Sequence, residues 1–155
     1  MNWVNRGLQL VAVVAITFLC WVGWENTTES LALATAANRH MVSTIEVHLG
    51  TEADELKFVP DRLQFEAGKR YKLVLDNPSP EKHYFTAKDF ADAIWTQKVE
   101  AGKVEVKGAV HELELKPGAI AEWVFIPQRP GTYGLRCTIA GHTEAGMTGT
   151  LVITE

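Results

Sequence analysis

The sequence predicts an all-β fold, a Greek-key sandwich of seven or eight short strands with one short helix and an N-terminal transmembrane helix. Apolar and polar residues alternate over several short segments, which is the period of a half-buried strand. Turn signals with Gly or Pro separate these segments about every 8–12 residues, a spacing typical of an antiparallel sandwich. The first 24 residues differ, because they carry a long uncharged apolar run.

The apolar run covers residues 7–24 and follows Arg6. A run of this length can cross a bilayer as a helix, and Arg6 is expected to stay on the cytoplasmic side. Two alternatives stay open: a signal peptide cleaved near residues 34–36, and a lipid anchor on Cys20. We therefore predict an anchor or signal segment over 1–24, a tether over 25–41 and a folded domain over 42–155. In each case the domain lies outside the cytoplasm, in a periplasm or thylakoid lumen.

Residues 42–155 alternate in the manner of strands, and we predict the elements in chain order. Pro60 cannot donate a ladder hydrogen bond, so residues 58–65 are expected to form a broken edge segment. Phe90, Ala93 and Ile94 would share one face of a helix, which predicts a short surface helix over 87–95. The remaining strands are expected at 43–49, 69–77, 83–86, 103–106, 110–115, 121–126, 131–137 and 149–153.

A cluster of potential metal ligands lies in the loop between the last two predicted strands. Cys137, His142 and Met147 follow one another at intervals of five residues, and His83 stands at the start of another predicted strand. A thiolate and a thioether combined with imidazoles favour copper over ions that prefer oxygen. Two His and one Cys with a long axial Met form the blue-copper arrangement, so we predict one type 1 copper ion at this site.

The other cysteine and histidines are weaker candidates. Cys20 lies inside the apolar run, so a disulfide with Cys137 would require the membrane segment to meet the folded domain. His48 and His111 lie in alternating strands beside acidic residues, which indicates solvated faces, and His40 lies in the predicted tether.

At these residues the chain resembles the cupredoxins, the type 1 copper proteins that include plastocyanin, azurin, auracyanin and rusticyanin. The resemblance covers residues 42–155, and the four-residue gaps on both sides of His142 are most similar to the ligand loops of auracyanin and rusticyanin. Many family members place Asn directly after the first His, where its side chain ties the two ligand loops together. Tyr84 occupies that position here.

The resemblance implies a one-electron carrier that exchanges electrons with a donor and an acceptor protein through the exposed edge of His142. A patch of small apolar residues would surround that edge: Pro80, Ala140, Gly141, Ala145 and Gly146. Lys82, Arg136 and Glu144 flank this patch and would orient a partner. Phe85, Phe125, Tyr133 and Leu135 would supply the dry shell that raises the potential of such a site. We expect a monomer.

Composition and motifs weigh against other functions. The formal net charge of −4 gives no support for nucleic-acid binding. A copper delivery, storage or sensing role is the alternative, but the chain has neither a Cys-x-x-Cys pair nor a methionine cluster. An enzyme is not expected, because Arg136 and Thr138 flank Cys137 where copper oxidases and nitrite reductases carry histidines that lead to a second metal site.

Overall fold

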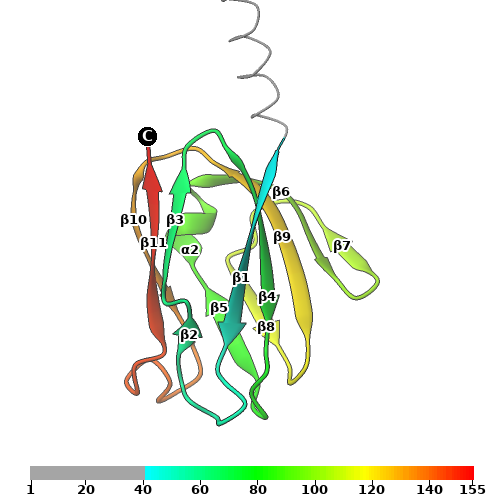
Figure 1. The fold of residues 1–155 in the computed structure, drawn as a ribbon, viewed down its shortest axis with the longest axis vertical. Coiled ribbons are helices and arrows are strands. Elements are labelled where there is room, and N and C mark those ends of the chain that lie inside the picture. Colours follow the sequence, from blue (N-terminus) through cyan, green and yellow to red (C-terminus); the bar gives the residue numbers. More distant parts are fainter. Residues whose placement is uncertain (1–40) are drawn as a thin grey trace, which may run out of the picture. The chain divides into compact units, whose positions relative to one another are not determined.

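Two β-sheets packed face to face make up residues 41–155, the part of the chain that the structure, a computed structural model, describes (Figure 1). These residues form a unit of their own. In sheet order, the first sheet contains β2 (Phe58–Val59), β1 (Val42–Leu49), β4 (Arg70–Asp76), β9 (Ile120–Pro127), β6 (Ile94–Ala101) and β7 (Val104–Val106). The second contains β3 (Arg62–Glu66), β11 (Thr148–Thr154), β10 (Gly131–Arg136), β5 (His83–Thr86) and β8 (Glu112–Leu115).

Alternation along the strands fills the space between the two sheets. In β4, Tyr71, Leu73 and Leu75 are buried while the residues between them are half-buried, as the period of two requires. Aromatic rings occupy the centre, where Phe125 contacts the ring of Trp123 at a centroid distance of 5.8 Å. The indole N–H of Trp123 donates to Thr96 Oγ1 at 3.1 Å, which satisfies the one polar atom of that buried side chain.

The segment around Pro60 changes sheet. β2 pairs with β1 at the edge of the first sheet, and β3 pairs with β11 at the edge of the second. The prediction of a broken edge segment over 58–65 is confirmed.

Three details of the predicted fold were wrong. β1 pairs with β4, and β3 with β11, in parallel, so the sandwich is not purely antiparallel. The described residues contain eleven strand segments rather than seven or eight, in part because residues 58–65 divide into β2 and β3 and because β6 was not predicted. The helix, α2 (Lys88–Ala91), is shorter than expected. Ala93 and Ile94 are buried as predicted, but they belong to the turn and strand that follow α2.

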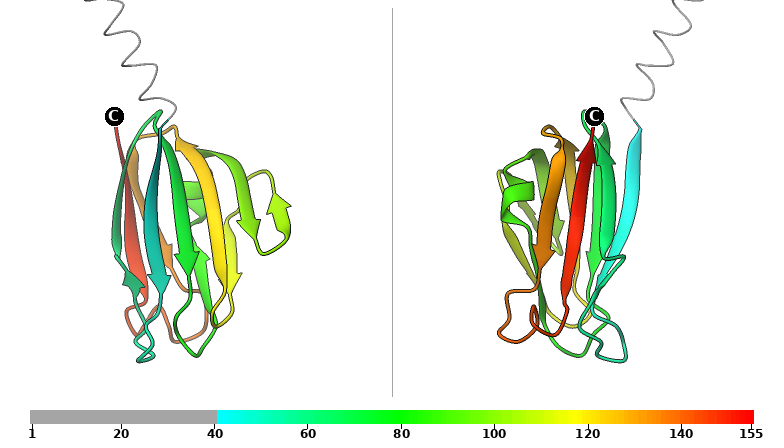
Figure 2. Two further views of the ribbon diagram at one scale, coloured as in Figure 1. Left: turned by 45° about the vertical axis from the view of Figure 1, so that its right-hand side comes forward. Right: turned by 90° about the vertical axis from the view of Figure 1, so that its left-hand side faces the viewer.

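The arrangement of the strands separates the two ends of the sandwich. β1 and β4 run in the same direction, and the loop 137–147 lies at the end where they finish (Figure 1). The C-terminus and the start of β1 lie at the opposite end, and the β6–β7 hairpin projects from one side (Figure 2). The chain therefore enters the domain at the end far from the predicted metal-binding loop.

No helix within residues 41–155 is long and apolar enough to span a membrane. The predicted anchor over 1–24 and all but the last residue of the predicted tether over 25–41 lie outside the described residues, and both stay predictions.

Candidate metal centre

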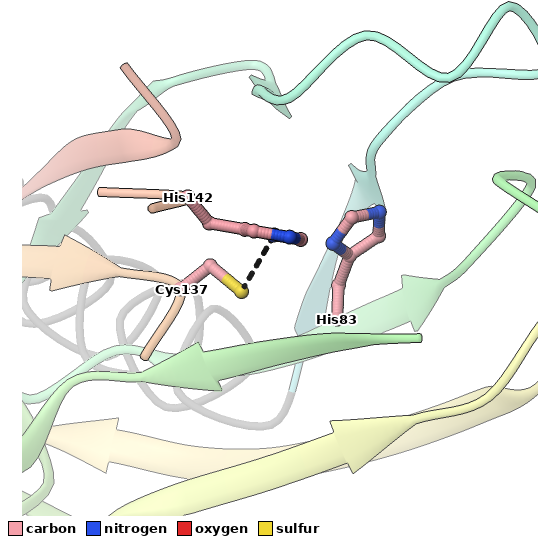
Figure 3. A group of neighbouring side chains, drawn as sticks. All are labelled: His83, Cys137 and His142. Carbon is pink, nitrogen blue, oxygen red and sulfur yellow. Dashed lines mark hydrogen bonds between the residues drawn. The ribbon is translucent and has the colours of Figure 1, made fainter. Parts of the chain in front are cut away.

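Three of the four predicted ligands come together at one end of the sandwich. His83 begins β5, Cys137 directly follows β10, and His142 lies in the loop that joins β10 to β11. Their ligand atoms all lie within 4.8 Å of one another. The three side chains point toward a common centre (Figure 3).

Strand periodicity explains why residues 54 positions apart in the sequence meet. His83 and Phe85 face the interior from β5, while Tyr84 and Thr86 face outward. β5 and β10 are antiparallel neighbours, so the start of β5 lies beside the residue that follows β10. That residue, Cys137, continues the inward alternation and is fully buried.

Main-chain hydrogen bonds shape the loop that carries the other ligands. The N–H of Cys137 donates to the carbonyl of Met147 at 3.1 Å, and the N–H of Met147 donates to the carbonyl of His142 at 2.9 Å. Thr143 Oγ1 donates to the carbonyl of Cys137 at 2.7 Å. These bonds hold Cys137, His142 and Met147 in one tight loop.

The thiol of Cys137 lies among donors that suit a thiolate. The N–H of Tyr84 points at Cys137 Sγ from 3.4 Å, and His142 Nδ1 lies 3.5 Å from the same sulfur (Figure 3). The exposed fraction of Cys137 is 0%. This N–H would donate a hydrogen bond to the sulfur of a metal-bound thiolate.

His83 is an imidazole without a partner. Its side chain is fully buried, and neither ring nitrogen has a hydrogen-bond partner among the described residues. Burial, followed by the charge of nearby His142, lowers the pKa of His83 below its ordinary value, which favours the neutral form that binds metals. Buried polar groups in proteins nearly always have a bonding partner, so the two ring nitrogens of His83 indicate that a ligand binds here. A copper ion fits this requirement.

Met147, the fourth predicted ligand, lies in the same loop as Cys137 and His142. It is fully buried, and its main chain bonds to both Cys137 and His142. Two imidazoles, one thiol and one thioether form a soft donor set of the kind that selects copper. The residues present therefore fit a type 1 copper ion.

The structure also shows residues around the site that the sequence reasoning missed. Gly50 has a φ of +78°, and a Cβ added there would lie 2.8 Å from His83 Nε2. Asn77 is buried, and its side chain bonds three main-chain groups, two of them, at Ser79 and Glu81, in the segment that leads to His83. An Asn followed by Pro-Ser-Pro was a signal for a structured turn, but its partners could not be read from it.

The remaining histidines of the described part lie outside this cluster. His48 pairs with Asp76 at 2.6 Å and His111 with Asp92 at 2.7 Å, and all four side chains are at least partly exposed. Of the predicted shell, Phe85, Phe125 and Leu135 are buried and Tyr133 is half-buried.

Comparison with known proteins identifies the class. Residues 45–154 match the family described as copper binding proteins of the plastocyanin/azurin type. The chain belongs to this family, the cupredoxins, as its sequence predicted. Its cofactor is one type 1 copper ion.

Individual relatives agree with this assignment. The chain is 28% identical over 146 residues to a plastocyanin from Prochlorothrix hollandica, covering 94% of this chain and 88% of the relative. An auracyanin from Roseiflexus castenholzii superimposes with a TM-score of 0.53 at 20% identity, covering 73% of this chain and 98% of the other. A multicopper oxidase from Aquifex aeolicus gives a TM-score of 0.57 at 14% identity, covering 76% of this chain but only 30% of the oxidase. These two structural similarities show a shared fold.

Proposed function

We propose that this protein is a one-electron carrier whose copper ion is bound by His83, Cys137, His142 and Met147. The observation that carries the proposal is the convergence of His83, Cys137 and His142 ligand atoms within 4.8 Å at a buried position. When bound, copper supplies a single reversible electron step between Cu(I) and Cu(II). All four positions of such a site would be filled by protein atoms, so no position is open for a substrate, and an enzyme is not proposed.

The residues of the chain prepare the site for fast electron exchange. His83, Cys137 and Met147 are each 0% exposed, which excludes water and keeps solvent reorganisation small. Tyr84 N–H and the closed 137–147 loop hold the thiolate in place. Since three donors are buried, the site does not resemble an exchangeable copper-delivery site, which needs open access.

His142 is the proposed point of electron entry and exit. It is the only one of the three clustered residues that is half-buried rather than buried. Pro80, Ala140, Gly141, Ala145 and Gly146 are all exposed, so small apolar residues would let a donor or acceptor protein approach closely. We propose that redox proteins dock on this patch and that the carrier is a monomer.

The first experiment compares the full chain with a Cys137→Ser variant after loading with Cu(II). The unchanged chain is expected to show an intense thiolate-to-copper absorption band and a narrow copper hyperfine splitting, both lost on reduction with ascorbate and restored by an oxidant. Cys137→Ser should lack the intense band, because serine cannot supply the sulfur that gives rise to it. Retention of the band in the variant would refute the assignment.

We further propose that residues 7–24 tether the domain to a membrane on its extracytoplasmic side. The proposal rests on the uncharged run after Arg6, and on the start of β1 lying at the end of the domain opposite to the metal centre. A tether attached there would leave the proposed docking patch free to face partners. Full chain expressed in a bacterium with a periplasm should remain in the membrane fraction after carbonate extraction, while a chain that begins after residue 24 should not. The intact mass of the purified protein separates the alternatives, since cleavage shortens the chain and lipidation of Cys20 adds mass.

A further inference from the structure

Three oxygen atoms from three separate segments meet on the outer face of the second sheet, beside the metal centre. Thr86 Oγ1 of β5 donates to Glu112 Oε2 of β8 at 2.7 Å. Thr138 Oγ1, from the residue that follows Cys137, donates to the same Glu112 oxygen at 2.8 Å. The two hydroxyl oxygens lie 3.3 Å apart. We refer to Glu112, Thr86 and Thr138 as the Glu112 cluster.

The Glu112 carboxylate accepts the hydrogen bonds of both threonine hydroxyls. Each threonine hydroxyl has a single proton, and both protons are directed at Glu112 Oε2. The contact between the two hydroxyls therefore adds little while the carboxylate is present. Without Glu112, the two threonines could form only one weaker bond with each other, because hydrogen bonds to a charged acceptor are stronger than neutral ones.

The cluster lies where the sheet itself provides little connection. The ladder between β5 and β10 contains one paired position, Arg136 with Thr86. His83 depends on β5 for its position, and Cys137 depends on the end of β10. The Glu112 cluster bonds Thr86, the β5 residue of that single pair, to Thr138, the residue immediately after Cys137. It thus adds a connection through side chains between the two ligand-bearing segments.

The contact between the main chain of Tyr84 and the sulfur of Cys137 depends on the spacing of these two segments. The N–H of Tyr84 reaches Cys137 Sγ at 3.4 Å, so β5 and the cysteine must keep their spacing. Its side chain, however, does not tie the two segments together, because the phenol donates to Glu114 instead. Lys82 also bonds Glu114, at 3.3 Å. The side chain of Tyr84 thus connects β5 to β8. The cysteine loop is connected to β5 through the side chains of the Glu112 cluster.

We propose that Glu112 is a positioning residue of the copper site, which holds Thr138, and through it Cys137, at a fixed distance from the strand that carries His83. The proposal rests on the ligand assignment made above. Glu112 touches neither the metal nor a redox partner in this role. It acts by limiting the motion of the cysteine against β5.

The test uses the full chain in four forms: unchanged, Glu112→Ala, Glu112→Gln and Glu114→Ala. Glu114→Ala is the matched control, because it removes another exposed carboxylate from the same strand whose partners, Tyr84 and Lys82, do not include the residue after Cys137. In the metal-free protein, NMR measures hydrogen exchange of the Cys137 amide, which donates to the carbonyl of Met147 at 3.1 Å. In the copper-loaded protein, the thiolate-to-copper absorption, the copper hyperfine splitting and the rate of copper release to a chelator are measured.

In Glu112→Ala we expect exchange of the Cys137 amide and copper release each to rise about tenfold, as expected for loss of roughly one to two hydrogen bonds to a charged group. The absorption maximum and hyperfine splitting should shift as well. Glu112→Gln retains a carbonyl oxygen that accepts the hydroxyls, so it should recover most of the unchanged behaviour. In Glu114→Ala both rates should stay within about twofold of the unchanged chain.

A double-mutant cycle isolates the contact. Adding Thr138→Val to Glu112→Ala should have only a small further effect, because the charged partner of the hydroxyl has already been removed and only the weaker bond to Thr86 is left to lose. The proposal is overturned if Glu112→Ala matches the unchanged chain, if Glu114→Ala has the same effect as Glu112→Ala, or if the two substitutions are additive. The amide-exchange readout needs no copper, so a failure of the copper assignment is distinguishable from a failure of this proposal.

Discussion

Gly50 shows how closely the site depends on single residues. It follows β1 with a φ of +78°, and an added Cβ would lie 2.8 Å from both His83 Nε2 and Ser79 Cβ. Two separate penalties would follow from a side chain here. One comes from the left-handed backbone conformation, and the other from contact with the imidazole.

Gly68 separates these two penalties, because its φ is also +78° but nothing lies within 4 Å of an added Cβ. Gly68→Ala should therefore lower the free energy of unfolding by about 1–2 kcal/mol through backbone strain alone. Gly50→Ala should cost about 1–3 kcal/mol more through overpacking, and it should also alter the copper spectrum by displacing His83. Urea unfolding of the metal-free variants and spectra of the loaded ones measure both effects. Equal destabilisation with unchanged spectra would contradict this reading of Gly50.

For single residues, the sequence indicated which side chains could bind a metal, but it did not indicate which other residues contact them. Cys137, His142 and Met147 could be identified from donor type and spacing, and His83 from its place at the start of a strand. Glu112 and Gly50 could not be found in this way, because neither is a ligand. An exposed Glu in an alternating strand and a Gly after a strand are common features, and only their neighbours give them a role.

The loop between β4 and β5 determines where His83 enters its strand. Asn77 is 1% exposed, and its side-chain amide donates to the carbonyls of Glu81 and Leu115, each at 2.8 Å. Its side-chain oxygen accepts the N–H of Ser79 at 3.0 Å. One side chain thus joins this loop to the end of β8.

Asn77→Ala should lower the free energy of unfolding by about 2–4 kcal/mol, because buried main-chain groups would lose their partners. Asn77→Asp offers a sharper comparison. It keeps the shape and the acceptor for Ser79 but directs a carboxylate at two carbonyl oxygens, so at neutral pH it should be at least as destabilising. Lowering the pH should recover part of the loss, since a protonated acid can donate one of the two bonds. Urea unfolding at two pH values tests this, and a loss below about 0.5 kcal/mol in Asn77→Ala would show that the loop does not depend on the amide.

Elements were predicted well where the pattern was local. The strands predicted at 69–77, 83–86 and 131–137 agree with β4, β5 and β10 to within one residue at each end. The helix was predicted too long because Phe90, Ala93 and Ile94 are all buried, and a period of three to four cannot distinguish a helix from a short helix followed by a turn and strand. The main chain decides the matter: Gln128 N–H and Arg129 N–H both donate to the carbonyl of Ala93.

The two ends of the molecule have different surfaces. The loop 137–147 exposes Ala140, Gly141, Ala145 and Gly146 around the half-buried His142, while the chain enters at the other end. A region of small residues suits close approach between two redox centres. The proposed docking patch can therefore be probed without changing the copper ligands.

Ala145→Lys should slow electron self-exchange between reduced and oxidised copies by about tenfold, because a charge placed at the patch would repel the same charge on the second copy. NMR line broadening measures this rate and needs no natural partner. Ala109→Lys is the matched control, since it makes the same change at an exposed alanine outside the patch. The reduction potential should change little in either variant. Equal slowing in both would mean that net charge, rather than the patch, controls the encounter.

For the whole molecule, the sequence by itself determined the sandwich class, the positions of most strands, the copper chemistry and the proposed ligands. These follow from residue types and from a period of two, and both are local properties. Only the tertiary structure decided which strands are neighbours, that β1 and β3 pair in parallel with β4 and β11, and that Glu112 bonds the residue beside Cys137. Local periodicity specifies which side of a strand faces the core, but it carries no information about the strand that lies alongside. The pairing depends on contacts between residues far apart in the chain, and those contacts exist only after the sheets have packed.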